Sequence, residues 1–198
     1  GSEELASPVL LNSDAKLAVA IDPLDGSSNI DTNVSIGTIF SILPVIGDLD
    51  EDLEQTFLQP GVNQLAAGFF IYGPQLALVL TVGQGTQIFV HSSTIGDFLQ
   101  DYESITIAER TSKFAINASN YRHCGKALSL YMDDCFMGLT GPRERDFNMH
   151  WIASLVADTY RILIRGGVFL YPRDNRKGYS EGRLRLVYEA NPIAYLIE

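Results

Sequence analysis

The chain has 198 residues, of which 46% are hydrophobic and 19% are charged, and it carries a formal net charge of −10 at pH 7. This composition indicates a folded protein of one large or two small domains and excludes a disordered segment. The negative charge argues against a general nucleic-acid-binding protein, which needs a basic face. An acidic protein that binds an anionic ligand also needs bound cations or local basic residues at its site.

Few signals bear on the location of the protein. No apolar run approaches the ~20 residues that a membrane-spanning helix needs, so no membrane association is expected. The two cysteines, Cys124 and Cys135, have no metal-binding spacing and are typical of thiols in a reducing compartment. No basic segment precedes an apolar stretch as in a secretory signal, and a cytoplasmic location is therefore expected.

The first half of the chain predicts β-strands. Residues 16–21 are mostly apolar and predict a buried strand that ends at Asp22. Residues 35–45 are β-branched and aromatic and predict a second strand, followed by an acidic loop or helix start at 48–54. Apolar runs separated by glycine-containing turns then predict an antiparallel meander, with strands at residues 65–72, 76–82 and 86–91. A short strand is expected at residues 105–108.

The second half of the chain is more helical. Amphipathic spacing predicts one helix over residues 125–135 and another over 146–165, with Asp146 as its N-cap and Gly166-Gly167 as its stop. Strands are expected at residues 168–171 and 183–188, and a last helix from residue 191. The change from strands to helices predicts two domains, residues 1–110 and residues 111–198.

The most informative segment follows the first predicted strand and reads Asp22-Pro-Leu-Asp25-Gly26-Ser27-Ser28. Its two carboxylates, with a proline that favours a turn between them, can hold a hard divalent cation. Its Gly-Ser-Ser part can offer backbone N–H groups and hydroxyls to a phosphate. Together they are the minimum for metal-assisted hydrolysis of a phosphate ester. Taken alone, D-x-x-D-G is more often a capped turn, and Gly-Ser-Ser is common in linkers.

A family resemblance decides between these explanations. The stretch D-P-L-D-G-S-S-N-I-D at residues 22–31, followed by V-S-I-G-T-I-F at 34–40, resembles the class I fructose-1,6-bisphosphatases of the Mg²⁺-dependent, lithium-sensitive phosphatase superfamily. Five further segments resemble that family in the same order: Q-P-G at 59–61, A-A-G at 66–68, I-N-A-S-N at 116–120, G-G-V-F-L-Y-P at 166–172 and R-L-R-L-V-Y-E-A-N-P at 183–192. The resemblance covers essentially the whole chain.

The resemblance implies a fold, a reaction and an assembly. The fold class is α/β (α+β), a layered sandwich with the active site between two sheets, here partial because the family's chain extends beyond both ends. Two other acidic metal-site residues of the family belong to the portion before residue 1. The implied reaction is hydrolysis of the 1-phosphate of fructose 1,6-bisphosphate to fructose 6-phosphate, with water as the nucleophile. The implied assembly is a homotetramer.

The resemblance also implies roles for individual residues. The metal ligands would be Glu3, Asp22, the Leu24 carbonyl, Asp25 and Glu189, holding two or more Mg²⁺ ions, with Mn²⁺ or Zn²⁺ as alternatives. The catalytic residues would be Glu4, as the base for the attacking water, together with Asp22 and Asp25. The 1-phosphate would be bound by Asp25, Gly26, Ser27 and Ser28, and the 6-phosphate end of the sugar by Asn117, Tyr171 and Arg183. His150 stands where the family usually has an arginine that reaches the neighbouring subunit's 6-phosphate.

Three alternatives stay open at this point. A sedoheptulose-1,7-bisphosphatase, or an enzyme that uses both sugars, is consistent with the same residues because both substrates carry a phosphate at each end. An enzyme specific for inositol phosphates is less consistent with the set of Asn117, Tyr171 and Arg183. A catalytically silent chain that binds a sugar phosphate or assembles with partner subunits is the alternative outside enzymes, because a metal site that lacks ligands binds its ion poorly.

Overall fold

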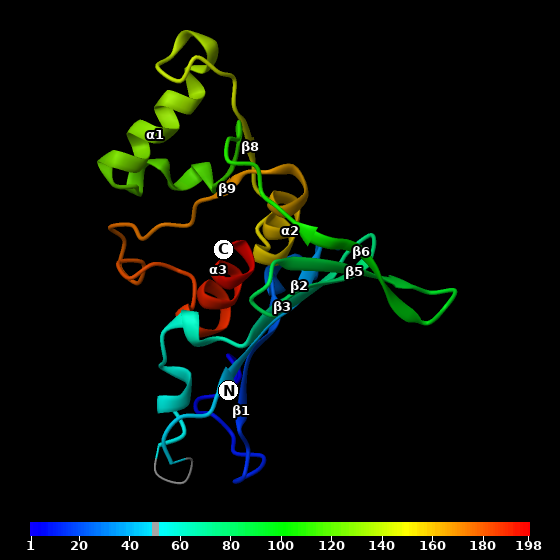
Figure 1. The fold of residues 1–198 in the computed structure, drawn as a ribbon. Helices are drawn as coiled ribbons and strands as arrows, with labels where there is room; N and C mark the ends of the chain where they lie inside the picture. The colour runs from blue at the N-terminus through cyan, green and yellow to red at the C-terminus, as the bar shows by residue number, and fades with distance from the viewer. Residues whose placement is uncertain (49–51) are drawn as a thin grey trace.

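A six-stranded antiparallel sheet dominates the computed structural model, which describes residues 1–48 and 52–198 (Figure 1). Its strands follow one another in chain order: β1 (Leu17–Asp25), β2 (Ile36–Pro44), β3 (Ala66–Tyr72), β4 (Leu76–Thr81), β5 (Thr86–Ser92) and β6 (Asp97–Ile105). The first five confirm the predicted strands and the meander. Of the acidic loop or helix start expected at residues 48–54, residues 49–51 lie outside the described part of the chain.

Strand β6 was not predicted, and the short strand expected at residues 105–108 is wrong, because Ile105 is the last residue of β6. Most side chains of β6 are exposed to solvent, as expected for the last strand of a sheet. A strand exposed on both faces has no apolar alternation, so its sequence carries no strand pattern.

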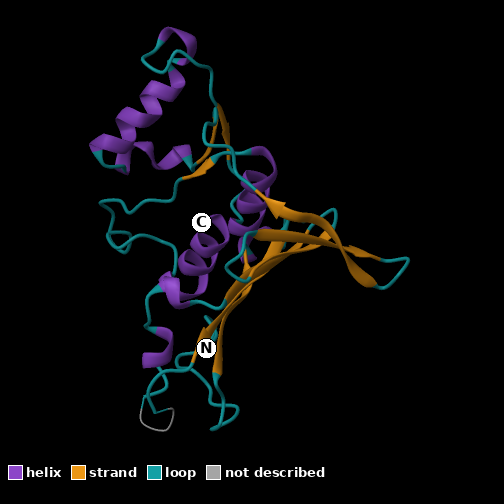
Figure 2. Ribbon diagram, viewed as in Figure 1, coloured by secondary structure: helices purple, strands orange, loops and turns teal. Residues whose placement is uncertain are grey.

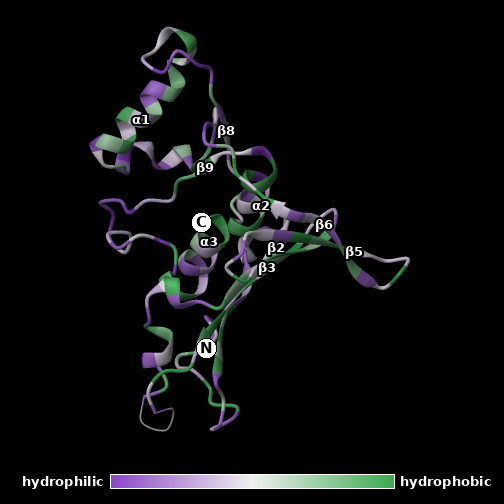
Figure 3. Ribbon diagram, viewed as in Figure 1, coloured by the Kyte–Doolittle hydropathy of each residue, from purple (hydrophilic) through white to green (hydrophobic). Residues whose placement is uncertain are grey.

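Two helices, α2 (Leu155–Arg165) and α3 (Asn191–Ile197), cover one face of this sheet (Figure 2). Burial along β2 alternates strictly, which places every second residue on the covered face of the sheet. The resulting core joins strand residues to helix residues, among them Ile39, Phe69, Val79, Ile88, Val156, Leu163 and Leu196. Figure 3 shows the same distribution as hydrophobic segments along the strands and within the helices.

A second, three-stranded parallel sheet has the order β8-β7-β9 and consists of β7 (Lys113–Ala115), β8 (Asn148–His150) and β9 (Val168–Phe169). Helix α1 (Lys126–Phe136) confirms the helix predicted at residues 125–135, and its Met132 and Cys135 pack on Phe114 of β7. Strands of two or three residues are too short to show a periodic pattern, which explains why β7 and β8 were missed. The strand expected at 168–171 is correspondingly shorter, since β9 ends at Phe169.

The long helix predicted at residues 146–165 is wrong in its first half. Helix α2 begins at Leu155 with Ser154 as its N-cap, and residues 148–150 belong to β8 instead. Asp146, the predicted cap, accepts a hydrogen bond from the Leu139 N–H at 3.1 Å. The predicted stop at Gly166 is confirmed, because this glycine has a φ of 69° and follows the last helical residue.

The strand predicted at residues 183–188 is also wrong. Residues Leu186–Ala190 form a single π-helical turn, called η6 here, that leads directly into α3. In this turn the N–H groups of Glu189 and Ala190 both donate to the Arg185 carbonyl, at 3.0 Å. Glu189 therefore lies inside a helical turn and not at the end of a strand, and π-helical turns are frequent at functional sites.

No helix in the described part of the chain combines the length and the apolar character needed to cross a membrane.

Candidate active site

Three buried carboxylates meet where β1 ends beneath η6. Asp22, Asp25 and Glu189 each offer one oxygen, and these oxygens lie within 4.8 Å of one another. The three residues are only 4%, 6% and 7% exposed. Acidic groups are seldom buried together without a counter-charge. Only the family resemblance predicted Glu189 at a metal site, and in the structure its carboxylate lies beside those of the two aspartates.

Strand β1 carries Asp22 to the cluster. Asp22 pairs with Ile39 across the β1–β2 ladder, so its side chain lies on the face that the helices cover. The ladder shifts register between Asp22 and Asp25, which bends the strand end. Asp22 Oδ1 accepts the Leu24 N–H at 3.0 Å, a local turn of the kind that aspartate favours. The bend turns both carboxylates toward the same space.

The start of α2 holds Asp25. Its Oδ2 atom accepts hydrogen bonds from the Ser154 hydroxyl and from the Val156 N–H, both at 3.0 Å. This close approach of α2 requires glycine at position 37, because a Cβ there would lie 2.2 Å from the Phe70 carbonyl oxygen and 2.6 Å from Val156 Cγ2. One oxygen of Asp25 is thereby fixed and its carboxylate orientation is set.

Arg185 links the cluster to the N-terminal segment. Glu189 Oε2 accepts the Arg185 N–H at 2.5 Å and lies 3.8 Å from Arg185 Nη1, while Arg185 Nη2 lies 2.7 Å from Glu3 Oε1. Glu3 is placed beside β1 by its own N–H, which donates to the Ile21 carbonyl at 3.0 Å. Arg185 therefore lies between Glu3 and Glu189 and links Glu3 to the cluster. Glu4 is exposed and makes no hydrogen bond or ion pair with the described residues.

The electrostatics of the cluster favour a bound cation. Burial, and then the hydrogen bond and negative charge of Asp22, raise the pKa of Glu3 to about 7. Burial also raises the pKa of Asp25 and of Glu189, and the charge of Asp22 adds to both shifts. A divalent cation would offset this repulsion, and oxygen-only ligands suit a hard ion. The residues present thus fit a divalent metal.

The Gly26-Ser27-Ser28 turn lies next to the carboxylates. Gly26 has a φ of 76°, and a Cβ at this position would lie 3.0 Å from Ser154 Cβ. Asn29 anchors the turn, because its side-chain amide donates to the carbonyls of Ile152 and Ala153 at 3.3 and 3.2 Å. Ser27 and Ser28 remain exposed, so their hydroxyls can reach a ligand.

A cleft of about 310 Å³ runs from this turn to the second sheet. One end is lined by Asp25, Gly26, Ser27, Ser28 and Glu189, and the other by Asn117, Trp151, Tyr171 and Arg183. Asn117, Trp151 and Tyr171 each come within two residues of the C-terminal end of β7, β8 or β9. Ligands of α/β proteins commonly bind at the C-terminal ends of parallel strands.

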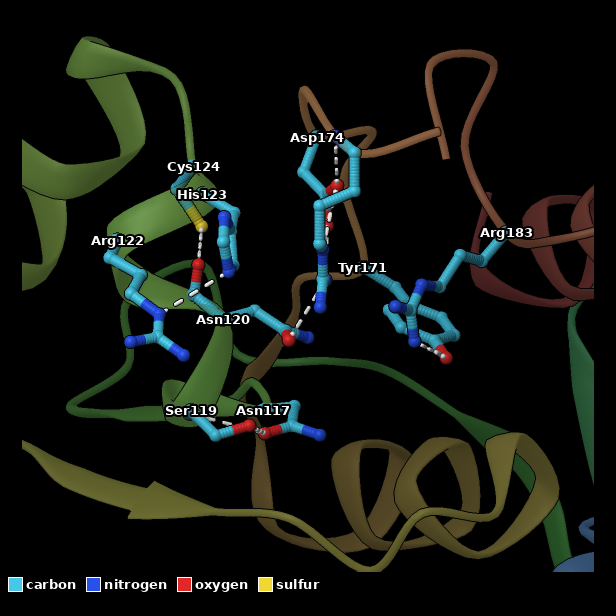
Figure 4. Close-up of polar contacts among 10 residues, drawn as sticks. Asn117, Ser119, Asn120, Arg122, His123, Cys124, Tyr171, Asp174 and Arg183 are labelled. Carbon is cyan, nitrogen blue, oxygen red and sulfur yellow. Dashed lines mark hydrogen bonds and ion pairs between the residues drawn. The ribbon is translucent and has the colours of Figure 1, made fainter. Parts of the chain in front are cut away.

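The far end of the cleft combines a guanidinium with aromatic rings. Arg183 Nη1 donates to the Tyr171 hydroxyl at 3.1 Å, and Figure 4 shows the two side chains in contact. The Arg183 guanidinium also lies 3.7 Å from the centre of the Tyr179 ring. Asn117 accepts a hydrogen bond from the Ser119 N–H at 3.2 Å, which leaves its amide NH₂ group available to a ligand.

Comparison with known proteins identifies the family. The family model for the fructose-1,6-bisphosphatase N-terminal domain matches residues 1–103, and the model for the C-terminal domain matches residues 107–198. The chain belongs to the fructose-1,6-bisphosphatase family. The family resemblance that the sequence motifs predicted is therefore confirmed.

Relatives and solved structures agree with this assignment. The chain is 71% identical to the class 1 fructose-1,6-bisphosphatase of Rhizobium meliloti (strain 1021) and 67% identical to that of Sinorhizobium medicae (strain WSM419), covering 100% of this chain and 56% of each relative. The Leishmania major fructose-1,6-bisphosphatase in its holo form is 33% identical with a TM-score of 0.90, over 99% of this chain and 62% of that chain. The chain thus spans little more than half the length of these relatives, and the predicted mixed α/β fold, itself partial, is confirmed.

Several residues that line the cleft had not been predicted to belong to it, and three of them make contacts that shape it. Trp151 stacks on Phe169 with ring centres 5.8 Å apart, and Ser154 and Arg185 hold Asp25 and Glu189. The Ser154 position was hidden by the wrong helix boundary. Arg185 was hidden by the strand predicted at residues 183–188, which the structure does not contain. Trp151 is the only tryptophan in the chain, and this could have marked it as a candidate binding residue in the sequence.

Proposed function

We propose that this protein hydrolyses the 1-phosphate of fructose 1,6-bisphosphate, giving fructose 6-phosphate and inorganic phosphate. The observation that carries the proposal is the cleft itself, which has a buried carboxylate cluster at one end and an arginine with aromatic partners at the other. A sugar with a phosphate at each end matches this arrangement, because cations held by the carboxylates would meet one phosphate and the arginine would meet the other. Family membership makes a phosphoric monoester hydrolase the natural activity class.

The metal cofactor is proposed to be Mg²⁺, two or more ions, with Mn²⁺ or Zn²⁺ as substitutes. Asp22, Asp25 and Glu189 would hold it, with the Leu24 carbonyl and Glu3 as further ligands. When bound, such ions lower the pKa of a water molecule and offset negative charge on the phosphate. The proposal rests on three buried carboxylates whose negative charges repel one another unless a cation lies between them.

The chain's own residues are proposed to bind and orient the substrate. Gly26, Ser27 and Ser28 would donate hydrogen bonds to the 1-phosphate from backbone N–H groups and hydroxyls. Asn117, Tyr171 and Arg183 would bind the phosphate at the other end, where the arginine supplies the positive charge that an acidic protein otherwise lacks. The proposed base is Glu4, on the strength of the family resemblance and its position next to Glu3.

Three further proposals concern the assembly, the location and the domains of the protein. A homotetramer is proposed from the resemblance to the family. A cytoplasmic location is proposed because Cys124 and Cys135 are both free thiols. The boundary between two domains is proposed at residue 110, between β6 and β7.

The test measures phosphate release from fructose 1,6-bisphosphate, sedoheptulose 1,7-bisphosphate and an inositol monophosphate, each with Mg²⁺ and with EDTA. It is made on the 198-residue chain and on the same chain extended to the length of its relatives. The proposal predicts Mg²⁺-dependent release, fastest from the fructose ester. Faster release from the sedoheptulose ester would reassign the substrate, and no release by the extended protein would support a non-catalytic role.

A further inference from the structure

Asp158 is the one buried carboxylate of α2, and the binding roles proposed above do not use it. Only 1% of the residue is exposed. Its Oδ2 atom accepts the Ile152 N–H at 3.2 Å, whereas its Oδ1 atom is buried without a hydrogen-bond partner. An unpartnered buried carboxylate oxygen lowers the stability of a fold, so helix packing alone does not explain an aspartate at this position.

The segment that Asp158 holds, residues 152–154, has an unfavourable backbone. Ala153 has a φ of 62°, a left-handed conformation that side chains other than glycine rarely adopt. Such a conformation persists only where surrounding contacts fix it. The contacts here are the Asp158 carboxylate, which accepts from Ile152, and the Asn29 amide, which donates to the carbonyls of Ile152 and Ala153.

This same segment fixes the metal-site carboxylate. Ser154 follows Ala153 directly, and its hydroxyl donates to Asp25 Oδ2, the atom that also accepts from the Val156 N–H. Ser154 also lies against Gly26, where a Cβ would approach its Cβ to 3.0 Å. A change in the path of residues 152–154 therefore moves both Asp25 and the phosphate-binding turn.

We propose that Asp158 is a positioning residue: by holding the left-handed turn at Ala153, it keeps Ser154 aligned to orient Asp25 toward the metal. This inference rests on the proposed function, because it concerns the same metal site. It predicts that loss of the Asp158 acceptor weakens metal binding without a direct effect on the sugar end of the cleft.

The test compares variants that separate this role from stability. Both Asp158→Leu and Asp158→Ala remove the acceptor. Leucine keeps the branched shape of the aspartate side chain and is larger, whereas alanine is smaller, so the variant that folds decides the result. Asp158→Asn retains a carbonyl oxygen for the Ile152 N–H and is the rescue variant. Thr159→Ala alters the neighbouring buried residue of α2 and controls for loss of stability.

The primary readout is the dissociation constant of Mn²⁺, measured by electron paramagnetic resonance on the 198-residue chain and on the chain extended to its relatives' length. The Leu or Ala variant should bind Mn²⁺ about 10- to 100-fold more weakly, whereas Asp158→Asn and Thr159→Ala should stay within about 3-fold of the wild type. In the extended protein the Mg²⁺ concentration for half-maximal phosphate release should rise in parallel. Three results would overturn the positioning role. The first is unchanged Mn²⁺ affinity in the Leu or Ala variant, and the second is an equal loss of affinity in Thr159→Ala. The third is failure of both the Leu and Ala variants to fold. A wild type that binds Mn²⁺ and releases no phosphate would overturn the proposed function alone.

Discussion

The Ser154 hydroxyl donates a hydrogen bond of 3.0 Å to Asp25 Oδ2, joining two residues that are 129 positions apart in the chain. Asp25 ends a strand of the first sheet, and Ser154 caps the helix that packs on it. The orientation of a candidate metal ligand thus depends on how closely α2 approaches the sheet. A metal site built this way should respond to packing changes that touch neither the metal nor the substrate.

Gly37→Ala tests that dependence. The added Cβ would meet the Phe70 carbonyl oxygen, which belongs to a sheet strand and cannot move aside, and Val156 on the helix. We expect a loss of about 1–3 kcal/mol in the free energy of unfolding, as for other overpacked cores, together with weaker metal binding. Gly125→Ala is the control, because no atom lies within 4 Å of the Cβ position there. Urea unfolding and Mn²⁺ titration measure the two effects. Wild-type Mn²⁺ affinity in a destabilised Gly37→Ala protein would show that metal binding does not depend on the packing of α2 on the sheet.

The raised pKa of Glu3 predicts a pH dependence of the metal-free protein. The folded state holds the Glu3 proton more tightly than the unfolded state does, with a pKa of about 7 against 4.5. The resulting stabilisation is fully present below pH 4.5 and is lost as the pH rises through 7. Asp25 and Glu189, whose pKa values are also raised, act in the same direction.

Unfolding in EDTA at pH 5.0, 6.0 and 7.5 checks this expectation. The wild type should lose stability relative to Glu3→Gln as the pH rises, since the variant lacks the titrating group. Mg²⁺ binds the ionised carboxylates, so its stabilising effect should be larger at pH 7.5 than at pH 5.0. A constant difference between wild type and variant across this range would show that Glu3 ionises normally in the folded protein.

The parts of the fold that followed from the sequence are those with an uninterrupted local pattern. The strands β1 to β5 and helix α1 each have enough residues to show alternation or helical spacing. The errors came where tertiary contacts replace the pattern. Residues 183–188 were predicted as an alternating strand, yet the hydrogen bonds of Glu189 and Ala190 to Arg185 close a helical turn. The pairing of Asp25 with Ser154 has no local signature, because it depends on the approach of α2 to Gly37.

Part of the candidate site was likewise predictable from the sequence and part was not. Asp22, Asp25 and the Gly26 turn were visible as one motif, and the resemblance added Glu189, Asn117, Tyr171 and Arg183. All of these residues except Asp22 line the cleft, and Asp22 lies with Asp25 and Glu189 in the carboxylate cluster. Arg185 and Trp151 became part of it only through the structure, because their neighbours in space are distant in the sequence.

Arg183→Ala tests the far end of the cleft. Arg183 is expected to bind the phosphate remote from the reaction, so its loss should raise the KM for fructose 1,6-bisphosphate about 10- to 100-fold while kcat changes little. Arg173→Ala removes an exposed arginine ten residues earlier and should leave both constants near their original values. Steady-state kinetics at saturating Mg²⁺ distinguish the outcomes. A fall in kcat with an unchanged KM would contradict a binding role for Arg183.

The most direct test of the metal-dependent mechanism is phosphate release from fructose 1,6-bisphosphate by the Asp22→Asn protein at saturating Mg²⁺. Asp31→Asn, which neutralises an exposed aspartate nine residues further along, is the matched control. Because Asp22 lies within the buried carboxylate cluster, its loss should lower kcat by about 100-fold or more, whereas Asp31→Asn should retain wild-type turnover. Both measurements belong in the protein extended to the length of its relatives. Wild-type turnover by Asp22→Asn would contradict the assignment of this cluster as the metal site.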